Sequence, residues 1–125
     1  MCIRDRRSIA LLVVMAQVGC FVPAQYAAFP IMHQLFARVA ADDAVEANVS
    51  TFAAEMRETA FILRNIDKRS IAIIDELGRG TSTRDGLAIA LAIAEALVES
   101  RALVWFATHS GDLACLLYTS PSPRD

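Results

Sequence analysis

The chain has 125 residues, which is enough for one domain or for part of one. Hydrophobic residues make up 55% of the sequence and charged residues 21%, a balance typical of globular proteins that excludes an intrinsically disordered chain. The formal net charge of -2 argues against a broad basic surface for nucleic acid on this segment, but it does not exclude DNA contact elsewhere in a longer protein.

Both ends of the chain read as translated adaptor sequence. Residues 1–5 and 115–119 can be encoded by nucleotide strings that are reverse complements of each other over almost their whole length. We therefore predict adaptor-like ends at residues 1–6 and 115–125, and one domain over residues 7–114.

The three cysteines indicate neither a zinc site nor a disulfide framework, because none of them has Cys-x-x-Cys spacing. Once the two ends are set aside, Cys20 is the only cysteine of the domain. We expect it to be a small buried residue in a reducing compartment.

The first predicted element is a helix end over residues 7–19, which is apolar at almost every position and therefore expected to be buried on all sides. The same region also resembles a secretory signal, because arginines come before an apolar run at residues 9–15. Residues 18–20 are similar to a lipoprotein cleavage site. That run is too short to span a bilayer. A small secreted or lipid-anchored protein is kept as an alternative. Residues 21–30 contain two prolines and predict a loop, and a strand is expected near residues 35–39.

Residues 41–49 are acidic and polar and predict a second loop. A helix is then predicted over residues 51–66 from the helical spacing of its apolar residues, Phe52, Met56, Ala60 and Leu63. Ser50 or Thr51 is expected to cap this helix, in an approximate capping arrangement with Glu55.

The second half of the chain contains the strongest strand signal. Residues 71–74 read Ile-Ala-Ile-Ile and predict a strand buried on both faces of a parallel sheet. A helix is predicted over residues 84–100 and another strand over residues 102–107; the helix has one apolar stripe, formed by Ile89, Ile93 and Leu97. Strands that alternate with helices predict an α/β fold with a parallel sheet flanked by helices.

Candidate functional residues follow two of the predicted strands directly. Asp75 and Glu76 end one strand, and Thr108-His109 end the next. Because the carboxyl ends of parallel strands meet at one edge of a sheet, these side chains are expected within reach of one ligand. Two adjacent acids at the end of an apolar strand fit Mg²⁺ bound to a nucleoside triphosphate, with one acid for the metal and the other for the attacking water. The plainer alternative is a solvated acidic pair.

Two further positions have both a functional and a plain interpretation. The helix N-terminus at Ser50 is an anion site, or Ser50 is only a helix cap. His109 could sense or stabilise a γ-phosphate, or it is a half-buried histidine after a strand.

Taken together, these motifs resemble the C-terminal ATPase domain of the MutS family of DNA mismatch-recognition proteins, over residues 7–114. The resemblance rests on residues 15–24, on Ser50-Thr51-Phe52, on residues 75–83 and on residues 106–109. The Asp-Glu-Leu-Gly-Arg-Gly-Thr string that begins at residue 75 is its most specific part. The resemblance implies a P-loop NTPase fold of the ABC-ATPase type, truncated because the Walker A strand and loop are missing.

The resemblance also implies roles for individual residues, with ATP and Mg²⁺ as cofactors. Asp75 looks like the Walker B acid that holds Mg²⁺, and Glu76 looks like the base or polariser of the hydrolytic water. His109 looks like the switch histidine near the γ-phosphate. Ser50, with Thr51 beside it, looks like the signature residue that reaches the nucleotide of the partner subunit. The expected partners are a second MutS-homologue subunit, joined through the ATPase domain, and duplex or branched DNA bound through domains absent here; no membrane is expected.

The sequence departs from the family pattern at one decisive point. The phosphate loop Gly-x-x-x-x-Gly-Lys-Ser/Thr, which cradles the phosphates, is missing. We therefore expect the segment itself to hydrolyse no ATP, and its parent to be a nuclear DNA-dependent ATPase of mismatch repair or meiotic recombination, with details that look closest to the eukaryotic meiotic homologue. The alternative in another class is a non-enzymatic dimerisation module.

Overall fold

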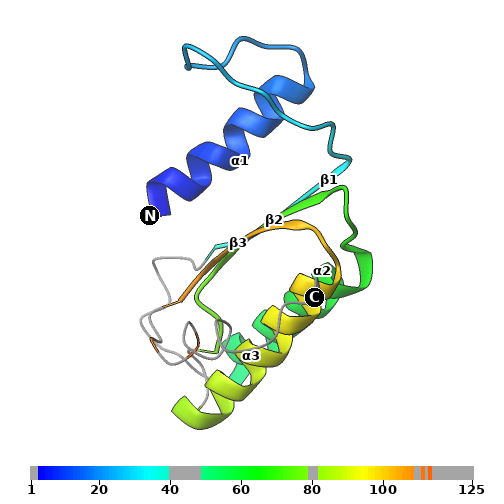
Figure 1. Ribbon diagram of the computed structural model, residues 1–125. Helices are drawn as coiled ribbons and strands as arrows, with labels where there is room; N and C mark the ends of the chain where they lie inside the picture. Colours follow the sequence, from blue (N-terminus) through cyan, green and yellow to red (C-terminus); the bar gives the residue numbers. More distant parts are fainter. Residues whose placement is uncertain (1–2, 40–48, 79–81, 109–110, 112, 114–125) are drawn as a thin grey trace.

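Three parallel strands form a sheet that has helices on both faces (Figure 1). The computed structural model describes residues 3–39, 49–78, 82–108, 111 and 113. The elements in chain order are α1 (Ile3–Gln17), β1 (Gln34–Arg38), α2 (Val49–Asn65), β2 (Ser70–Asp75), α3 (Thr83–Glu99) and β3 (Leu103–Ala107). The α/β class and the parallel sheet are thereby confirmed. The predicted strands and the last two predicted helices lie within two residues of the observed ones, the usual uncertainty of element ends.

Strand β2 lies at the centre of the sheet, in the order β1-β2-β3. All six of its residues are buried, which confirms the prediction of a strand covered on both faces. β1 pairs with it in a register that places Arg38 opposite Ile74, and β3 pairs with it so that Ala107 lies opposite Asp75. Both registers bring the carboxyl ends of the three strands to one edge of the sheet.

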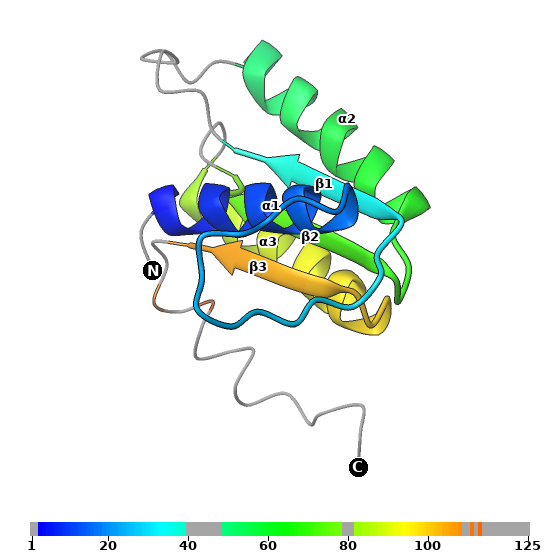
Figure 2. The same cartoon turned by 90° about the horizontal axis from the view of Figure 1, so that it is seen from above.

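Helices α2 and α3 cover one face of the sheet, and α1 lies on the other (Figures 1 and 2). The two crossovers, β1-α2-β2 and β2-α3-β3, step across the sheet in the same direction, so parallel connections of one hand place both helices on the same face. The main core cluster lies between this face and the two helices and consists of Ile62, Ile74, Ile93 and Leu97. Each such side chain removed from water contributes about 1.5–3 kcal/mol.

Helix α1 corrects one prediction. Its residue Val13 is buried, but Leu11 is 61% exposed and Val14 47% exposed, so the helix is not covered on all sides in the part of the chain that the structure describes. The prediction failed because an all-apolar helix indicates burial only where other elements are present to cover each face. Cys20 is free and exposed, which corrects the expectation that it is buried.

The end of α1 is defined by Gly19, whose φ is 79°. The Gly19 amide donates to the Ala16 carbonyl (3.1 Å) and the Cys20 amide donates to the Met15 carbonyl (2.9 Å), the pair of bonds that defines a Schellman motif. The loop predicted from the prolines of residues 21–30 follows and is confirmed. The second predicted loop, at residues 41–49, lies outside the described residues apart from Val49, which is helical.

Helix α2 has the predicted helical period, but the face that it buries is shifted. The predicted stripe residues are only half-buried, while Glu55, Thr59 and Ile62 are 5%, 2% and 5% exposed. The helix begins at Val49, so Ser50 and Thr51 lie in its first turn rather than at the cap position. Glu55 does not complete a cap, because its carboxylate bonds to a residue after β2.

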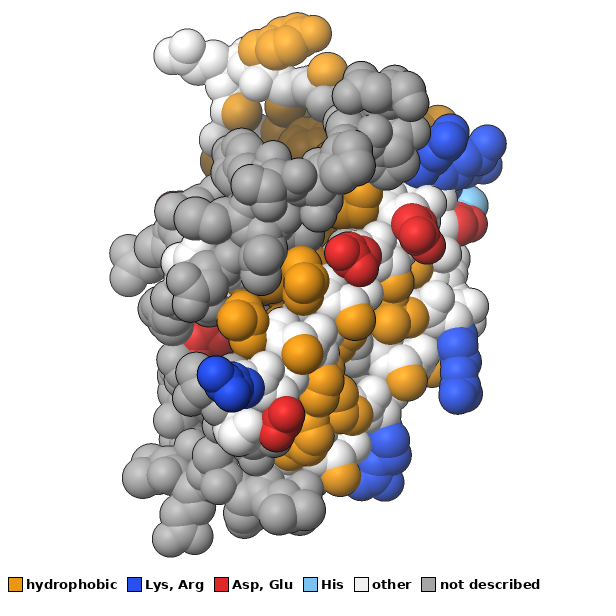
Figure 3. All heavy atoms as spheres, turned by 60° about the horizontal axis from the view of Figure 1, so that its bottom comes forward, with side chains coloured by type: hydrophobic (Ala, Val, Ile, Leu, Met, Phe, Trp, Pro, Cys, Tyr) orange, Lys and Arg blue, Asp and Glu red, His pale blue; other side chains and the backbone are white. Residues whose placement is uncertain are grey.

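The surface over α2 and α3 mixes charge and apolar side chains. Figure 3 shows hydrophobic side chains on this face between acidic and basic ones, with no single-sign patch. Phe61 on α2 is 61% exposed and Val98 on α3 is 53% exposed. The described side chains on this face therefore carry charges of both signs. Among the described residues, no helix combines the length and the hydropathy that a membrane span requires.

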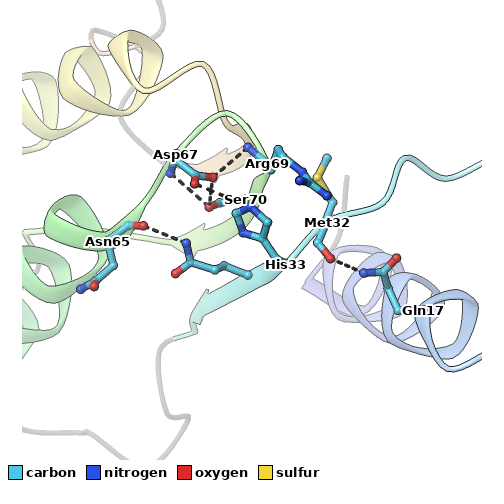
Figure 4. A network of polar contacts seen from close by, with 8 residues as sticks. Gln17, Met32, His33, Asn65, Asp67, Arg69 and Ser70 are labelled. Carbon is cyan, nitrogen blue, oxygen red and sulfur yellow. Dashed lines mark hydrogen bonds and ion pairs between the residues drawn. The ribbon is translucent and has the colours of Figure 1, made fainter.

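A polar turn joins α2 to β2 at the amino end of the sheet (Figure 4). Asp67 accepts hydrogen bonds from the Arg69 backbone amide (2.8 Å) and from the Ser70 hydroxyl (2.9 Å). The imidazole Nε2 of His33 lies 3.8 Å from the same carboxylate. The backbone N–H of Arg69, and after it the Ser70 hydroxyl, hold the pKa of Asp67 below its ordinary value of 3.8.

This lowered pKa makes a pH-dependent contribution to stability. A carboxylate whose pKa is depressed by folding stabilises the folded state above its unfolded pKa, and this contribution is lost as the pH falls through the folded pKa. We expect Asp67→Asn to lower the urea midpoint of the chain at pH 7, and the difference from wild type to shrink as the pH falls below 3.8. The fluorescence of Trp105, the single tryptophan, reports the unfolding. If the urea midpoints of wild type and Asp67→Asn differed as much below pH 3.8 as at pH 7, this interpretation would be contradicted.

Candidate functional site

The predicted acidic pair lies at the carboxyl end of the central strand. Asp75 is the last residue of β2 and is 4% exposed. Glu76 follows it with a φ of 47°, in the left-handed region that a glutamate rarely adopts. The Glu76 amide donates to the Ala107 carbonyl of β3 (3.0 Å), so this unusual backbone conformation is held against the neighbouring strand. Backbone outliers of this kind cluster at functional sites.

The neighbouring strands bring further polar residues to the same edge. The register places Asp75 opposite Ala107, so Thr108 follows at the same edge as Glu76. Arg38 ends β1 on the other side of β2. His109, the predicted switch histidine, lies outside the described residues. The expected meeting of strand ends is thus confirmed for Asp75, Glu76 and Thr108, and stays a prediction for His109.

All three helices point their N-termini at this edge (Figure 2). The C-terminal residue of α1, Gln17, donates its side-chain amide to the Met32 carbonyl just before β1, and Gln34 at the start of β1 donates to the Asn65 carbonyl at the end of α2 (3.0 Å). Helix α3 begins at this edge, since it follows the loop after β2. The positive ends of the α2 and α3 dipoles therefore lie at the same edge as the acidic pair and favour an anionic ligand there.

The loop between β2 and α3 is packed tightly at its two described ends. Gly78 has a φ of 84°, and a Cβ added to it would lie 2.9 Å from the Cα of Gly86 in the first turns of α3. Ser82 caps α3: its hydroxyl accepts from the Asp85 amide (3.2 Å) and donates to the Asp85 carboxylate (2.6 Å). Residues 79–81 of the predicted loop lie outside the described residues.

An ionic cluster around the buried Glu55 connects this loop to α2 and β1. The Glu55 carboxylate accepts a hydrogen bond from the Gly78 amide (3.1 Å) and lies 3.6 Å from the Arg38 guanidinium. The Arg38 Nε atom lies 3.1 Å from Glu58, an ionic contact without hydrogen-bond geometry. Sequence reasoning missed this cluster. The sequence did contain a signal for a buried carboxylate, because the spacing of Glu55 from Phe52 (three residues) and from Ile62 (seven residues) places it on the core-facing side of the helix.

The predicted signature residues lie close by. Ser50 and Thr51 are in the first turn of α2, five and four residues before Glu55, which corresponds to about 7.5 and 6 Å along the helix axis. The first turn therefore extends past the sheet edge, on the same side as the acidic pair. The side chains of these two residues lie outside what the structure describes.

Asp75 is the described residue whose position fits Mg²⁺. Its carboxylate is a hard oxygen donor at the mouth of the sheet, and Mg²⁺ commonly takes one or two carboxylates together with water and substrate phosphates. Among residues 3–39, 49–78, 82–108, 111 and 113, no group of three or more His, Cys, Asp or Glu side chains could hold a metal ion.

The sequence of this domain matches a known family. The family model described as MutS domain V matches residues 6–122. The chain belongs to the MutS family. This membership confirms the resemblance drawn from the Asp-Glu-Leu-Gly-Arg-Gly-Thr string and its companion motifs.

Similar MutS-family proteins come from eukaryotes and bacteria. The chain is 45% identical over 118 residues to the DNA mismatch repair protein MSH4 of Arabidopsis thaliana and 48% identical over 103 residues to the human MutS protein homolog 4. It is 50% identical over 112 residues to the DNA mismatch repair protein MutS of Desulfitobacterium hafniense. These alignments cover 94%, 82% and 88% of this chain but only 15%, 11% and 13% of the relatives. The chain therefore spans a small part of the length of the MutS proteins that it matches.

The match to MutS domain V includes residues on both sides of the predicted end of the domain at residue 114. Residues 114–125 lie outside the described residues, and α1 begins at Ile3. The division into adaptor-like ends at residues 1–6 and 115–125 and a domain at 7–114 stays a prediction.

Proposed function

We propose that this segment forms part of the ATPase domain of a MutS-family protein that couples ATP binding and hydrolysis to the recognition of mismatched or branched DNA. The observation that supports this most strongly is the acidic pair at the carboxyl end of the central parallel strand, with Glu76 held in a left-handed conformation by its bond to β3. In open α/β sheets, ligands bind at the carboxyl ends of the strands. The N-termini of α2 and α3 at the same edge favour a polyphosphate.

Each acid has a separate role in this proposal. Asp75, buried at the end of β2, helps to hold the Mg²⁺ that accompanies ATP. Glu76, half-buried and one residue further out, polarises the attacking water. His109 is proposed to contact the γ-phosphate, and Ser50 with Thr51 to reach the nucleotide of a partner subunit. Bound Mg²⁺ would neutralise charge that develops on the phosphates.

The fold in this proposal is a P-loop NTPase of the ABC-ATPase type whose phosphate loop is supplied outside this segment. The single lysine of the chain, Lys68, lies in the turn before β2, at the opposite edge of the sheet from Asp75. It therefore cannot serve as the lysine of a phosphate loop. For this reason we propose that the segment alone hydrolyses no ATP, although the intact protein does.

The wider biological role is proposed from the relatives. Their names include DNA mismatch repair, and four eukaryotic relatives at 45–50% identity are MutS homologue 4 proteins. Bacterial MutS proteins are 47–51% identical to the chain, so identity alone does not separate the two groups. We propose a nuclear protein that acts with a second MutS-homologue subunit, in mismatch repair or, from the detailed motifs, in meiotic recombination. DNA would be bound by parts outside this segment.

The experiment that tests this function is ATP hydrolysis by the intact protein and by residues 1–125 alone. We expect the intact protein to hydrolyse ATP in the presence of Mg²⁺. Hydrolysis should stop when EDTA removes the metal, and its rate should change when DNA is added. The segment alone is expected to show no turnover. An intact protein without Mg²⁺-dependent hydrolysis would overturn the proposal.

A further inference from the structure

Glu55 is a buried carboxylate whose partners come from two other elements. It is 5% exposed, and the hydrogen bond that it accepts comes from Gly78, 23 residues further along the chain. Its other partner, Arg38, ends β1. A carboxylate buried without partners is costly, so the position of Glu55 is tied to the positions of both. The carboxylate thus joins α2 to the end of β1 and to the segment after β2.

The segment that Glu55 holds contains the candidate catalytic residue. The Glu76 amide is fixed to the Ala107 carbonyl of β3, and two residues later the Gly78 amide is fixed to Glu55 on α2. Leu77 between them packs against the core cluster. Glu76 and Gly78 both have positive φ, at 47° and 84°. A glutamate persists in this conformation only where its surroundings over-determine it, and the two backbone bonds provide that restraint.

The same helix also carries the predicted signature residues. Ser50 and Thr51 lie one turn or more before Glu55 on α2, so a displacement of that turn moves the Glu55 carboxylate with it. The hydrogen bond between Glu55 and Gly78 would pass this displacement on to the backbone of residues 76–78, which carries the Glu76 side chain.

We propose that Glu55 is a positioning residue that fixes the 76–78 backbone, and with it the Glu76 carboxylate, through its hydrogen bond to Gly78. The proposal rests on the proposed ATPase function, and it deepens that function by adding a physical connection between α2 and the acidic pair. Glu55 itself touches neither nucleotide nor water in this account. It acts through the geometry of Glu76, because a small misplacement of a reacting group lowers the rate strongly.

The chain offers a matched control for this proposal. Glu58 lies three residues after Glu55 on α2 and contacts the same Arg38, but it is exposed, and the Gly78 amide donates to Glu55 instead. A change at Glu58 therefore alters the same ionic cluster without altering the bond to the loop. Glu55→Gln keeps a side-chain oxygen that can accept from the Gly78 amide, and Glu55→Met removes it at similar volume.

The experiment compares Glu55→Met, Glu55→Gln and Glu58→Met in the intact protein. We expect Glu55→Met to lower kcat for ATP by about 10- to 100-fold with KM within about threefold, while Glu55→Gln and Glu58→Met stay within about threefold of wild type. If Glu55→Met does not fold, Glu55→Asp, which withdraws the carboxylate by one methylene group, must show the same loss. Equal kcat for Glu55→Met and Glu58→Met would overturn the proposal, as would a loss in Glu55→Gln as large as in Glu55→Met.

A second readout does not depend on hydrolysis. We expect amide hydrogen exchange in a peptide that covers residues 76–78 to be faster in Glu55→Met than in wild type, and unchanged in Glu58→Met. If wild-type protein shows no ATP turnover, the proposed function fails, and exchange still decides whether Glu55 holds this segment. Unchanged exchange in Glu55→Met would overturn the positioning role.

Discussion

Replacing Glu76 by glutamine in the intact protein should lower kcat for ATP hydrolysis by about 10²- to 10⁴-fold, the range typical of a lost general base. Glutamine has nearly the same shape, but its amide cannot take up the proton of the attacking water. Because Asp75 and the backbone of the site are unchanged, the affinity for ATP should stay within about threefold of wild type, as expected for an interaction made only in the transition state. Single-turnover hydrolysis and equilibrium ATP binding separate the two quantities.

The control for this substitution is Glu99→Gln. Glu99 is exposed and ends α3, at the opposite edge of the sheet from Glu76. It has the same chemistry and lies on the same domain, so a general effect of losing one negative charge would appear in both variants. A Glu76→Gln protein that hydrolyses ATP within about threefold of the wild-type rate would exclude Glu76 as the residue that activates water.

Replacing Gly78 by alanine should lower the free energy of unfolding of the chain by about 2–4 kcal/mol. About 1–2 kcal/mol comes from placing a Cβ in the left-handed conformation, at a φ of 84°. The remainder comes from overpacking, because the new Cβ would lie 2.9 Å from the Gly86 backbone. Relieving this contact requires a shift of the backbone at residue 78 or at Gly86. Urea denaturation followed by the fluorescence of Trp105 in β3 measures the change.

Gly19→Ala is the matched control for the close approach. Gly19 has a φ of 79°, nearly that of Gly78, but a Cβ at this position would meet nothing within 4 Å. Its substitution should therefore cost only the conformational part, about 1–2 kcal/mol, reduced by the smaller entropy of the unfolded chain with alanine. If the two substitutions were equally destabilising, the approach of Gly78 to Gly86 would not contribute to the stability of the loop.

The parts of the fold that were predictable from sequence are those fixed by local pattern. The isoleucines of β2 predicted a strand buried on both faces, and the stripe of Ile89, Ile93 and Leu97 predicted the core-facing side of α3. Asp75 and Glu76 could be placed at the sheet edge because the carboxyl end of a buried parallel strand is a position that sequence alone defines.

The parts that sequence missed depend on contacts between distant residues. The left-handed conformation of Glu76 follows from its bond to β3 and is not a preference of glutamate. Glu55 was expected in a cap, but a carboxylate on the buried side of α2 found Gly78 and Arg38 instead. Burial of α1 was overestimated because apolar composition does not say which elements cover a helix.

The proposed nucleotide site depends on one arrangement: Asp75 at the carboxyl end of β2 helps to hold a divalent ion that arrives with a nucleotide. The most direct measurement is the affinity of Mn²⁺ for the ATP complex of the intact protein, read by electron paramagnetic resonance, in wild type, Asp75→Asn and Asp67→Asn. Asp67 is an acid at the opposite edge of the sheet and serves as the control. We expect Asp75→Asn to weaken Mn²⁺ binding by about 10- to 100-fold and Asp67→Asn to leave it unchanged. Equal Mn²⁺ affinity in wild type and Asp75→Asn would contradict the assignment of this edge as the nucleotide site.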